Sequence, residues 1–157
     1  MKQLAIFATL LVTIGGCSST NNPVSPITDT IQSHNLQFTF SIPRPSYGTH
    51  DTLVAAMKAY NPGDTTVIVY IPVCWPIAWY SVQDSSGTTR LSYAAPRNVR
   101  CNSVIEYSVL PHQSQQVSML DVKVPIVELD TTQTPQGSYL LTVDNGFGAF
   151  SLKFTVN

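Results

Sequence analysis

The sequence predicts an all-β protein, an antiparallel immunoglobulin-like β-sandwich of about eight or nine strands. Three observations support this prediction. Apolar residues recur at every second position rather than with the helical period of 3.6 residues. The apolar segments are short and follow one another at spacings of about 8–14 residues. Between them, 11 prolines and 8 glycines interrupt the chain. A closed β-barrel is the alternative for such a pattern.

The individual strands follow from the same alternation. In Leu36–Ile42, four apolar residues alternate with polar ones, and Pro43 and Pro45 end the segment. At the other end of the chain, Ala149–Val156 alternates as cleanly and follows the hairpin signal Asp144-Asn145-Gly146. Further strands are expected at Leu53–Tyr60, Thr65–Ile71, Ile77–Gln83, Thr88–Tyr93, Ser103–Leu110, Gln116–Val124 and Ser138–Val143. The alanines of Leu53–Tyr60 would also permit a helix.

Turn chemistry accounts for the aspartates between these segments. Asn61-Pro62-Gly63-Asp64 combines a fixed proline φ with a glycine that accepts positive φ, and Asp84 opens a second turn that ends at Gly87. Aspartate side chains in turns bond to their own backbone, so a calcium site built from such loops is the minor alternative. Within the strands, we expect Ile105, Tyr107 and Val109 to share one face and Trp79 to lie in the core.

Residues 1–16 have the anatomy of an export signal. Lys2 supplies the positive start, and Leu4–Ile14 is an uncharged apolar run that is too short to span a bilayer. The sequence Ile14-Gly15-Gly16-Cys17 then resembles the lipobox of bacterial lipoproteins. The resemblance implies lipidation of Cys17, with membrane lipid as its partner, because two or more acyl chains give stable anchoring. A plain secretory signal is the alternative. We expect a location in the cell envelope, at the outer membrane if the host is diderm.

The mature chain divides into two parts by composition. Residues 17–35 are polar and contain Pro23 and Pro26, which predicts a disordered tether behind the lipid. Residues 36–157 form the predicted β-sandwich domain, which is long enough to bury a core of its own.

The cysteines indicate one disulfide. With Cys17 lipidated, Cys74 and Cys101 remain as a pair, and an exported compartment permits a bridge between them. Neither cysteine belongs to a CxxC pair, so a redox or metal site is the less favoured interpretation.

Charge and motifs exclude several functions. The chain has a formal net charge of −1 and no basic stripe, which argues against nucleic-acid binding. The sequence has no GxSxG, HExxH or phosphate-binding glycine loop, and the histidines His34, His50 and His112 do not have the spacing of metal ligands. We therefore expect a non-enzymatic protein without a cofactor or a metal.

Two segments joined by the expected bridge form the candidate contact surface. Trp75 and Pro76 follow Cys74, and Arg97 and Arg100 precede Cys101. Aromatic residues on a rigid loop are typical of binding surfaces, because little conformational entropy is lost on docking. The alternative is that Trp75 packs on the disulfide, as a tryptophan does in immunoglobulin domains.

Leu53–Val156 resembles the BsuPI-type intracellular proteinase inhibitor domain, which has an immunoglobulin-like fold. The matching marks are a strand that runs into Asn61, the β-branched Val67–Ile71, Tyr80–Asp84 with Gly87, a turn at Leu110–Ser114, and Gly137–Leu141, which resembles the Gly-x-Tyr strand start of the family. His112 stands where the family usually has glycine, paired cysteines are not a general family feature, and no reactive residue is carried over.

The resemblance implies a binding module that inhibits a proteinase through the Trp75 loop. The alternative is a structural or assembly component of an envelope complex without inhibitory activity. Such a component would dock through an exposed strand edge, for which Leu36–Ile42 is the candidate. A glycan-binding module or an enzyme has the least support.

Overall fold

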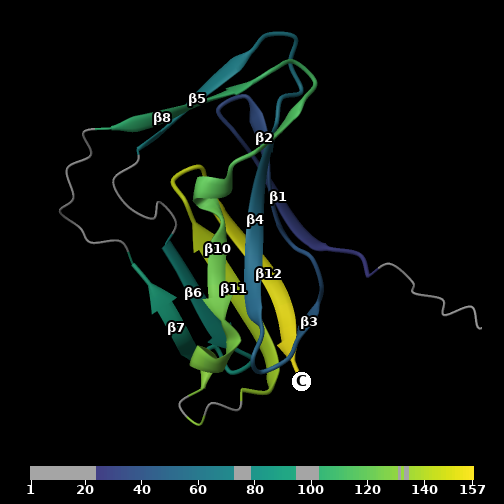
Figure 1. Ribbon diagram of the computed structural model, residues 1–157, viewed down its shortest axis with the longest axis vertical. Helices are drawn as coiled ribbons and strands as arrows, with labels where there is room; N and C mark the ends of the chain where they lie inside the picture. Colours follow the sequence, from purple (N-terminus) through teal and green to yellow (C-terminus); the bar gives the residue numbers. More distant parts are fainter. Residues whose placement is uncertain (1–23, 73–78, 95–102, 131, 133–134) are drawn as a thin grey trace, which may run out of the picture.

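The computed structural model describes residues 24–72, 79–94, 103–130, 132 and 135–157. In this part of the chain, the regular structure consists of short strands and two single-turn 3₁₀ helices (Figure 1). The elements are β1 (Ile27–Ser33), β2 (Leu36–Ile42), β3 (Ser46–Tyr47), β4 (Thr52–Tyr60), β5 (Val67–Pro72), β6 (Trp79–Asp84), β7 (Thr89–Tyr93), β8 (Val104–Val109), β9 (Ser114–Gln116), η1 (Ser118–Leu120), β10 (Val122–Pro125), η2 (Ile126–Leu129), β11 (Gly137–Asp144) and β12 (Ala149–Val156). No helix in these ranges is long and apolar enough to cross a membrane.

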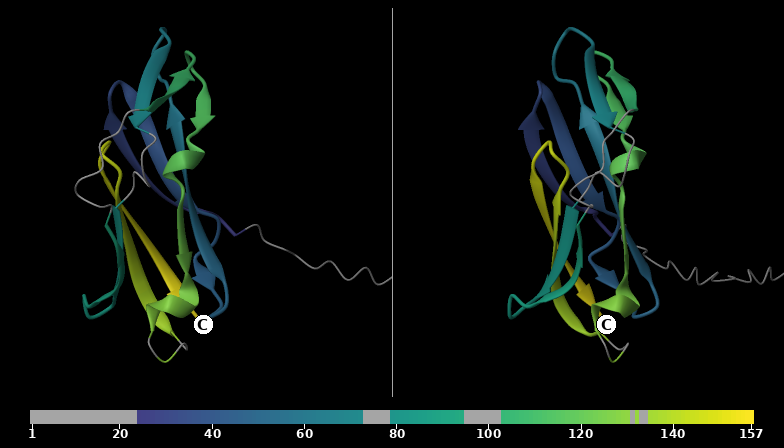
Figure 2. Two further views of the ribbon diagram at one scale, coloured as in Figure 1. Left: turned by 60° about the vertical axis from the view of Figure 1, so that its left-hand side comes forward. Right: turned by 90° about the vertical axis from the view of Figure 1, so that its left-hand side faces the viewer.

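The strands build two facing sheets and one separate ribbon. The first sheet has the order β1-β2-β4-β10, with β9 also paired to β4, and the second has the order β3-β12-β11-β6-β7. Figure 2 shows the two sheets as opposed layers. Neighbouring strands are antiparallel except for β3, which runs parallel to β12. The predicted all-β antiparallel sandwich is confirmed, with 12 strands in the described ranges rather than eight or nine.

The core comes from the alternation that predicted the strands. β2 buries Leu36, Phe38, Phe40 and Ile42, and the intervening residues are only half-buried. The opposite layer supplies the inward residues of β12, among them Phe150, and the rings of Phe40 and Phe150 lie 5.4 Å apart across the sandwich. β4 is a strand despite its alanines, because Leu53, Ala55, Met57 and Ala59 all face this core.

The folded domain begins before Leu36, so the predicted tether 17–35 is too long. Ile27–Ser33 forms β1, which pairs with β2 along its whole length. His34 and Asn35 form the turn between them, with φ of 53° and 61°. Two residues of positive φ match the right-handed twist of a hairpin. The polar composition of this segment does not indicate a strand, because β1 is stabilised mainly by backbone hydrogen bonds to β2 and buries its apolar side chains only partly.

The predicted strand Gln116–Val124 is also corrected, because two strands and η1 occupy this region. Gln116 lies opposite Lys58, and a regular register would then place Met119 opposite Ala55; Val122 lies there instead. The extra residues coil into η1. Asp121 fills the gap in the ladder, since its Oδ1 accepts a hydrogen bond of 3.0 Å from the Met57 amide.

The topology corrects the expected docking edge as well. β2, the candidate segment Leu36–Ile42, lies between β1 and β4 and has no free edge. β1 is the edge strand on this side of the sheet.

β5 and β8 form a two-stranded ribbon that extends beyond the sandwich at the top of Figure 1. Val69 and Val109 bury the inner face of the ribbon, whereas Ile68 and Tyr70 on its outer face are 46% and 59% exposed. Ile105, Tyr107 and Val109 share the inner face as predicted, but Ile105 is 36% exposed although its partner Ile71 on β5 is buried.

Candidate binding cleft

The residues predicted to form the functional site lie outside the described ranges. They are the lipidation residue Cys17, the disulfide pair Cys74 and Cys101, and the contact residues Trp75, Pro76, Arg97 and Arg100. Their nearest described neighbours are informative. Pro72 ends β5, Val104 begins β8, and these two residues are paired across the ribbon. The segments that carry Cys74 and Cys101 therefore leave from the same end of the ribbon.

A cleft lies between this ribbon and the sandwich, and we call it the ring cleft. It consists of two adjoining cavities of about 480 and 260 Å³ that share His34, Tyr70 and Phe147. Four regions far apart in sequence form it: the β1–β2 turn, strand β5, the start of β6 and the β11–β12 turn. Its lining residues are His34, Ile68, Val69, Tyr70, Ile71, Trp79, Asp144, Asn145, Gly146 and Phe147.

The β11–β12 turn is a preorganised wall of the cleft. Asn145 is buried, its Oδ1 accepts a hydrogen bond of 3.2 Å from the Phe147 amide, and its Nδ2 lies 3.0 Å from the Met57 sulfur. The Phe147 ring stacks on Phe38 at 4.6 Å and meets the His34 ring edge-on at 5.6 Å. These contacts fix Phe147 before any ligand arrives, which lowers the entropic cost of binding.

Trp79 belongs to this cleft and not to the core, where we expected it. Its side chain is 53% exposed. The period of two explains the difference: Tyr80 and Val82 face the interior at half-buried and buried positions, so Trp79 and Tyr80 point to opposite sides of β6. His34 falls within the predicted tether 17–35, so the sequence prediction does not include it in the site. The residues 34 and 35 could have been read as a two-residue hairpin loop.

The cleft is apolar and weakly acidic. Among the described residues that line it, Asp144 is the only carboxylate, and none is a lysine or an arginine. Oδ1 of Asp144 accepts a hydrogen bond of 3.1 Å from the Gly146 amide and so also shapes the turn. No group of three or more His, Cys, Asp or Glu residues that could hold a metal ion occurs in the described part of the chain. Such a cleft can bind apolar groups accompanied by a cation.

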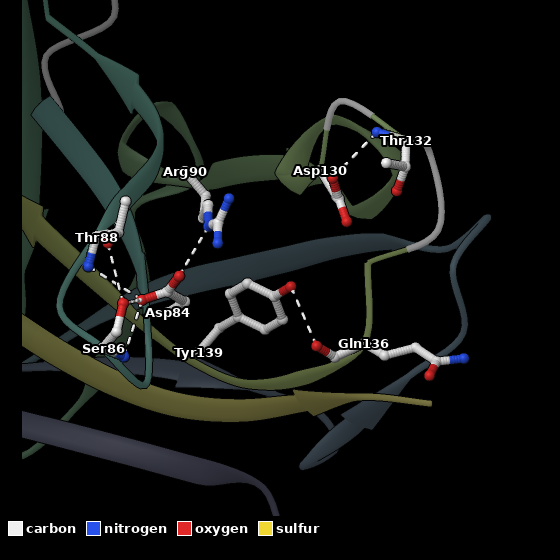
Figure 3. Close-up of polar contacts among 8 residues, drawn as sticks. All are labelled: Asp84, Ser86, Thr88, Arg90, Asp130, Thr132, Gln136 and Tyr139. Carbon is white, nitrogen blue, oxygen red and sulfur yellow. Dashed lines mark hydrogen bonds and ion pairs between the residues drawn. The ribbon is translucent and has the colours of Figure 1, made fainter.

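A second cavity, of about 510 Å³, lies near the β6–β7 turn and is lined by residues that include Asp84 and Tyr139. Figure 3 shows the polar contacts beside it. Asp84 accepts hydrogen bonds from the Ser86 hydroxyl, the Ser86 and Thr88 amides and Arg90. The Ser86 hydroxyl contributes most to holding the pKa of Asp84 at about 2. The carboxylate of Asp84 therefore stabilises the β6–β7 turn through hydrogen bonds within that turn, which confirms the predicted turn chemistry.

The Tyr139 hydroxyl beside this turn donates a long hydrogen bond of 3.5 Å to the Gln136 carbonyl, and burial raises the pKa of Tyr139. A neutral phenol bonded to a loop carbonyl has a structural role. The ring cleft is therefore the better candidate site.

Comparisons with known proteins identify no family. No protein-family model matches the chain, and no curated protein matches it. Among solved structures, a β-glucosidase from Listeria innocua in complex with glucose is similar at 11% identity and a TM-score of 0.42, over 78% of this chain. A β-glucosidase from Erythrobacter marinus is similar at 13% identity and a TM-score of 0.39, over 83% of this chain. This chain spans 16% of the length of each of these two enzymes.

A third similarity is to the CARDB domain of a Pyrococcus furiosus protein, crystallised in complex with di-metal ions. It is 9% identical, with a TM-score of 0.37, over 83% of this chain and 90% of that domain. At such TM-scores these similarities carry no argument about function.

Proposed function

We propose that the protein is a lipid-anchored binding module of the cell envelope, without enzymatic activity, that holds a protein partner at the β5–β8 end of its sandwich. The observation that carries this proposal is the gathering of exposed apolar side chains at that end. Ile68, Tyr70, Trp79 and Val104 are between 46% and 59% exposed. Exposed apolar patches of this kind mark interaction surfaces, and tryptophan and tyrosine dominate their binding energy.

The anchoring part of the proposal rests on the lipobox at Cys17. Since β1 begins at Ile27, nine residues separate Cys17 from the first strand, and nine residues reach at most about 30 Å whatever their conformation. The domain then stays close to the lipid surface. Metabolic labelling with palmitate tests the anchor: the wild-type protein should incorporate label and enter the detergent phase. A Cys17→Ser variant should do neither, and label retained in that variant would contradict the proposal.

A Cys74–Cys101 disulfide would brace the proposed surface. The pairing of Pro72 with Val104 supports it, because the two cysteines follow and precede the paired positions by only two and three residues. Closing this loop would contribute about 3.5 kcal/mol in the chain-entropy account. Mass spectrometry of a non-reduced digest tests the bridge directly, and free thiols at both positions in the exported protein would contradict it.

Proteinase inhibition is the more specific form of the proposal and rests on the resemblance to the BsuPI-type family. The backbone at His112, where that family usually has glycine, has φ of 55°, a conformation that favours glycine. In this form, Trp75 and Pro76 would enter the proteinase cleft, with Arg97 and Arg100 beside them.

Titration of the mature protein against serine, cysteine and metalloproteinases tests inhibition. Stoichiometric inhibition that is lost in Trp75→Ala and weakened by reduction is the expected result. A folded, disulfide-bonded protein that inhibits none of them would overturn the inhibitor form in favour of the alternative, an assembly component of an envelope complex. Because β1 is the edge strand, an edge-docked assembly should respond to a lysine introduced at Thr28 or Thr30, whose side chains are exposed.

A further inference from the structure

One edge of β5 has no partner strand among the residues that the structure describes. β5 pairs with β8 along its other edge, and the described residues supply no further backbone hydrogen bond to it. In an antiparallel pair, every second residue points both its N–H and its C=O away from the partner strand. Within the described part of the chain, β5 therefore offers a row of backbone donors and acceptors without a partner, which an additional strand can satisfy.

The ring cleft runs along this free edge. Ile68, Val69, Tyr70 and Ile71 all border it, Tyr70 in both of its cavities. Successive side chains of a strand point to opposite faces, so a cavity above one face would touch only alternate residues. One cavity of the cleft borders three consecutive residues, Ile68, Val69 and Tyr70, and the other borders Tyr70 and Ile71, so the cleft lies beside the β5 backbone itself. The backbone groups of β5 that have no partner in the described ranges consequently face the cleft.

The opposite side of the cleft supplies side-chain recognition. The rings of His34, Trp79 and Phe147 offer apolar surface for the alternate side chains of an incoming strand. Asp144 lies beside Trp79, since these two residues are paired between β11 and β6. The carboxylate has no cation among the described lining residues, which favours a ligand with a positive charge at this end.

We infer that the ring cleft binds an extended peptide of a partner protein, which adds to β5 as the third strand of the ribbon and places a lysine or arginine at Asp144. The inference rests on the proposed binding function and gives it a partner chemistry. A free strand edge favours a peptide over a glycan, because a sugar would use the rings and Asp144 but would leave the backbone groups of β5 unpaired. Strand addition would also complete a two-stranded ribbon, which is marginal by itself.

The test begins with a displayed library of random linear peptides, selected on the full mature protein in detergent. We expect enrichment of sequences with apolar residues at alternate positions and a nearby lysine or arginine. The best peptide is then synthesised in two forms, N-methylated at one or the other set of alternate amides. Only one set can donate to β5, so one form should lose at least about tenfold in affinity and the other should retain binding.

Substitutions at the cleft complete the test. Tyr70→Ala and Trp79→Ala should each lower the affinity for the unmodified peptide by about tenfold. Asp144→Asn keeps an oxygen for the Gly146 amide but loses the charge, so it should remove the preference for lysine or arginine. Asp64→Asn is the matched control, because Asp64 is exposed in the turn before β5 and does not line the cleft. This variant should bind the peptide with the affinity of the wild-type protein. Both exposed aromatic residues can be replaced without disturbing the core.

Three outcomes would overturn the inference. They are equal binding by both N-methylated forms, the absence of any enriched peptide that depends on Tyr70 or Trp79, and a glycan array that shows sugar binding abolished by Trp79→Ala. These results are distinguishable from a failure of the proposed function. An envelope protein cross-linked at Ile68, but insensitive to a competing peptide, would leave the binding module standing and remove only strand addition.

Discussion

Asp29 on β1 accepts a hydrogen bond of 2.7 Å from the backbone amide of Ser151 on β12, and this bond joins the two sheets of the sandwich. Its other carboxylate oxygen accepts the Thr30 amide at 2.9 Å. β1 is therefore an integral part of the domain, tied both to β2 by its ladder and to the opposite sheet by one carboxylate.

Removal of this carboxylate should loosen β1. We expect Asp29→Ala to lower the free energy of unfolding by about 1 kcal/mol, because the Ser151 amide loses a charge-assisted partner. The measurements are urea denaturation and hydrogen exchange at Ser151, which should become faster. Asp64→Ala removes the same charge from an exposed side chain and should change little. Equal effects of the two substitutions would show that the bond to Ser151 does not matter.

Gly148 allows β1 and β12 to approach each other. Its φ is 156°, and a Cβ at this position would clash with Cδ1 of Ile31. We expect Gly148→Ala to destabilise the fold by about 1–3 kcal/mol. Gly87→Ala separates the two causes, because Gly87 also has positive φ but has open space around it. Ile31→Val removes the clashing methyl group and should recover part of the loss in the Gly148→Ala background; no recovery would contradict the steric explanation.

Asn61 holds the base of the ribbon. It is buried, its Nδ2 donates to the carbonyls of Thr65 at 2.7 Å and Val109 at 2.9 Å, and its Oδ1 accepts the Gly63 amide at 2.9 Å. We expect Asn61→Ala to lower the free energy of unfolding, measured by chemical denaturation, by about 2–3 kcal/mol. The substitution leaves the carbonyls of Thr65 and Val109 and the Gly63 amide without this hydrogen-bond partner. Gln115→Ala, at an exposed position of β9, is the control. If the two substitutions cost the same, the amide of Asn61 does not hold the ribbon.

The Asp84 turn makes a prediction about pH. The pKa of Asp84 is about 2, below its ordinary value of 3.8, first because the Ser86 hydroxyl bonds to the carboxylate and then because Arg90 lies beside it. A lowered pKa in the folded state stabilises the fold above pH 3.8, and this contribution is lost as the pH falls through about 2. Carboxyl NMR titration should find a higher Asp84 pKa in Ser86→Ala and no change in Ser85→Ala. An unchanged pKa in Ser86→Ala would contradict the assignment.

Features that depend on neighbouring residues could be predicted from the amino-acid sequence. The alternation of β2, β4 and β12 reveals which face each strand buries, because side chains on a strand repeat every two residues. The turn at Asp84 is equally local, since its carboxylate bonds to residues two to six positions away. The class of the fold follows from such local signals.

Features in which residues distant in sequence meet depend on the tertiary packing. β1 has a weak local signal and becomes a strand because β2 and Ser151 supply its partners. Trp79 is exposed because the register of β6 turns Tyr80 and Val82 inward. The ring cleft brings together residues 34, 70, 79 and 147, from turns and strands whose positions only the packing of the two sheets and the ribbon fixes. The alternation of apolar and polar residues indicates which face of a strand is buried, but it does not indicate which distant surface lies opposite that strand. A binding cleft depends on which surfaces lie opposite each other.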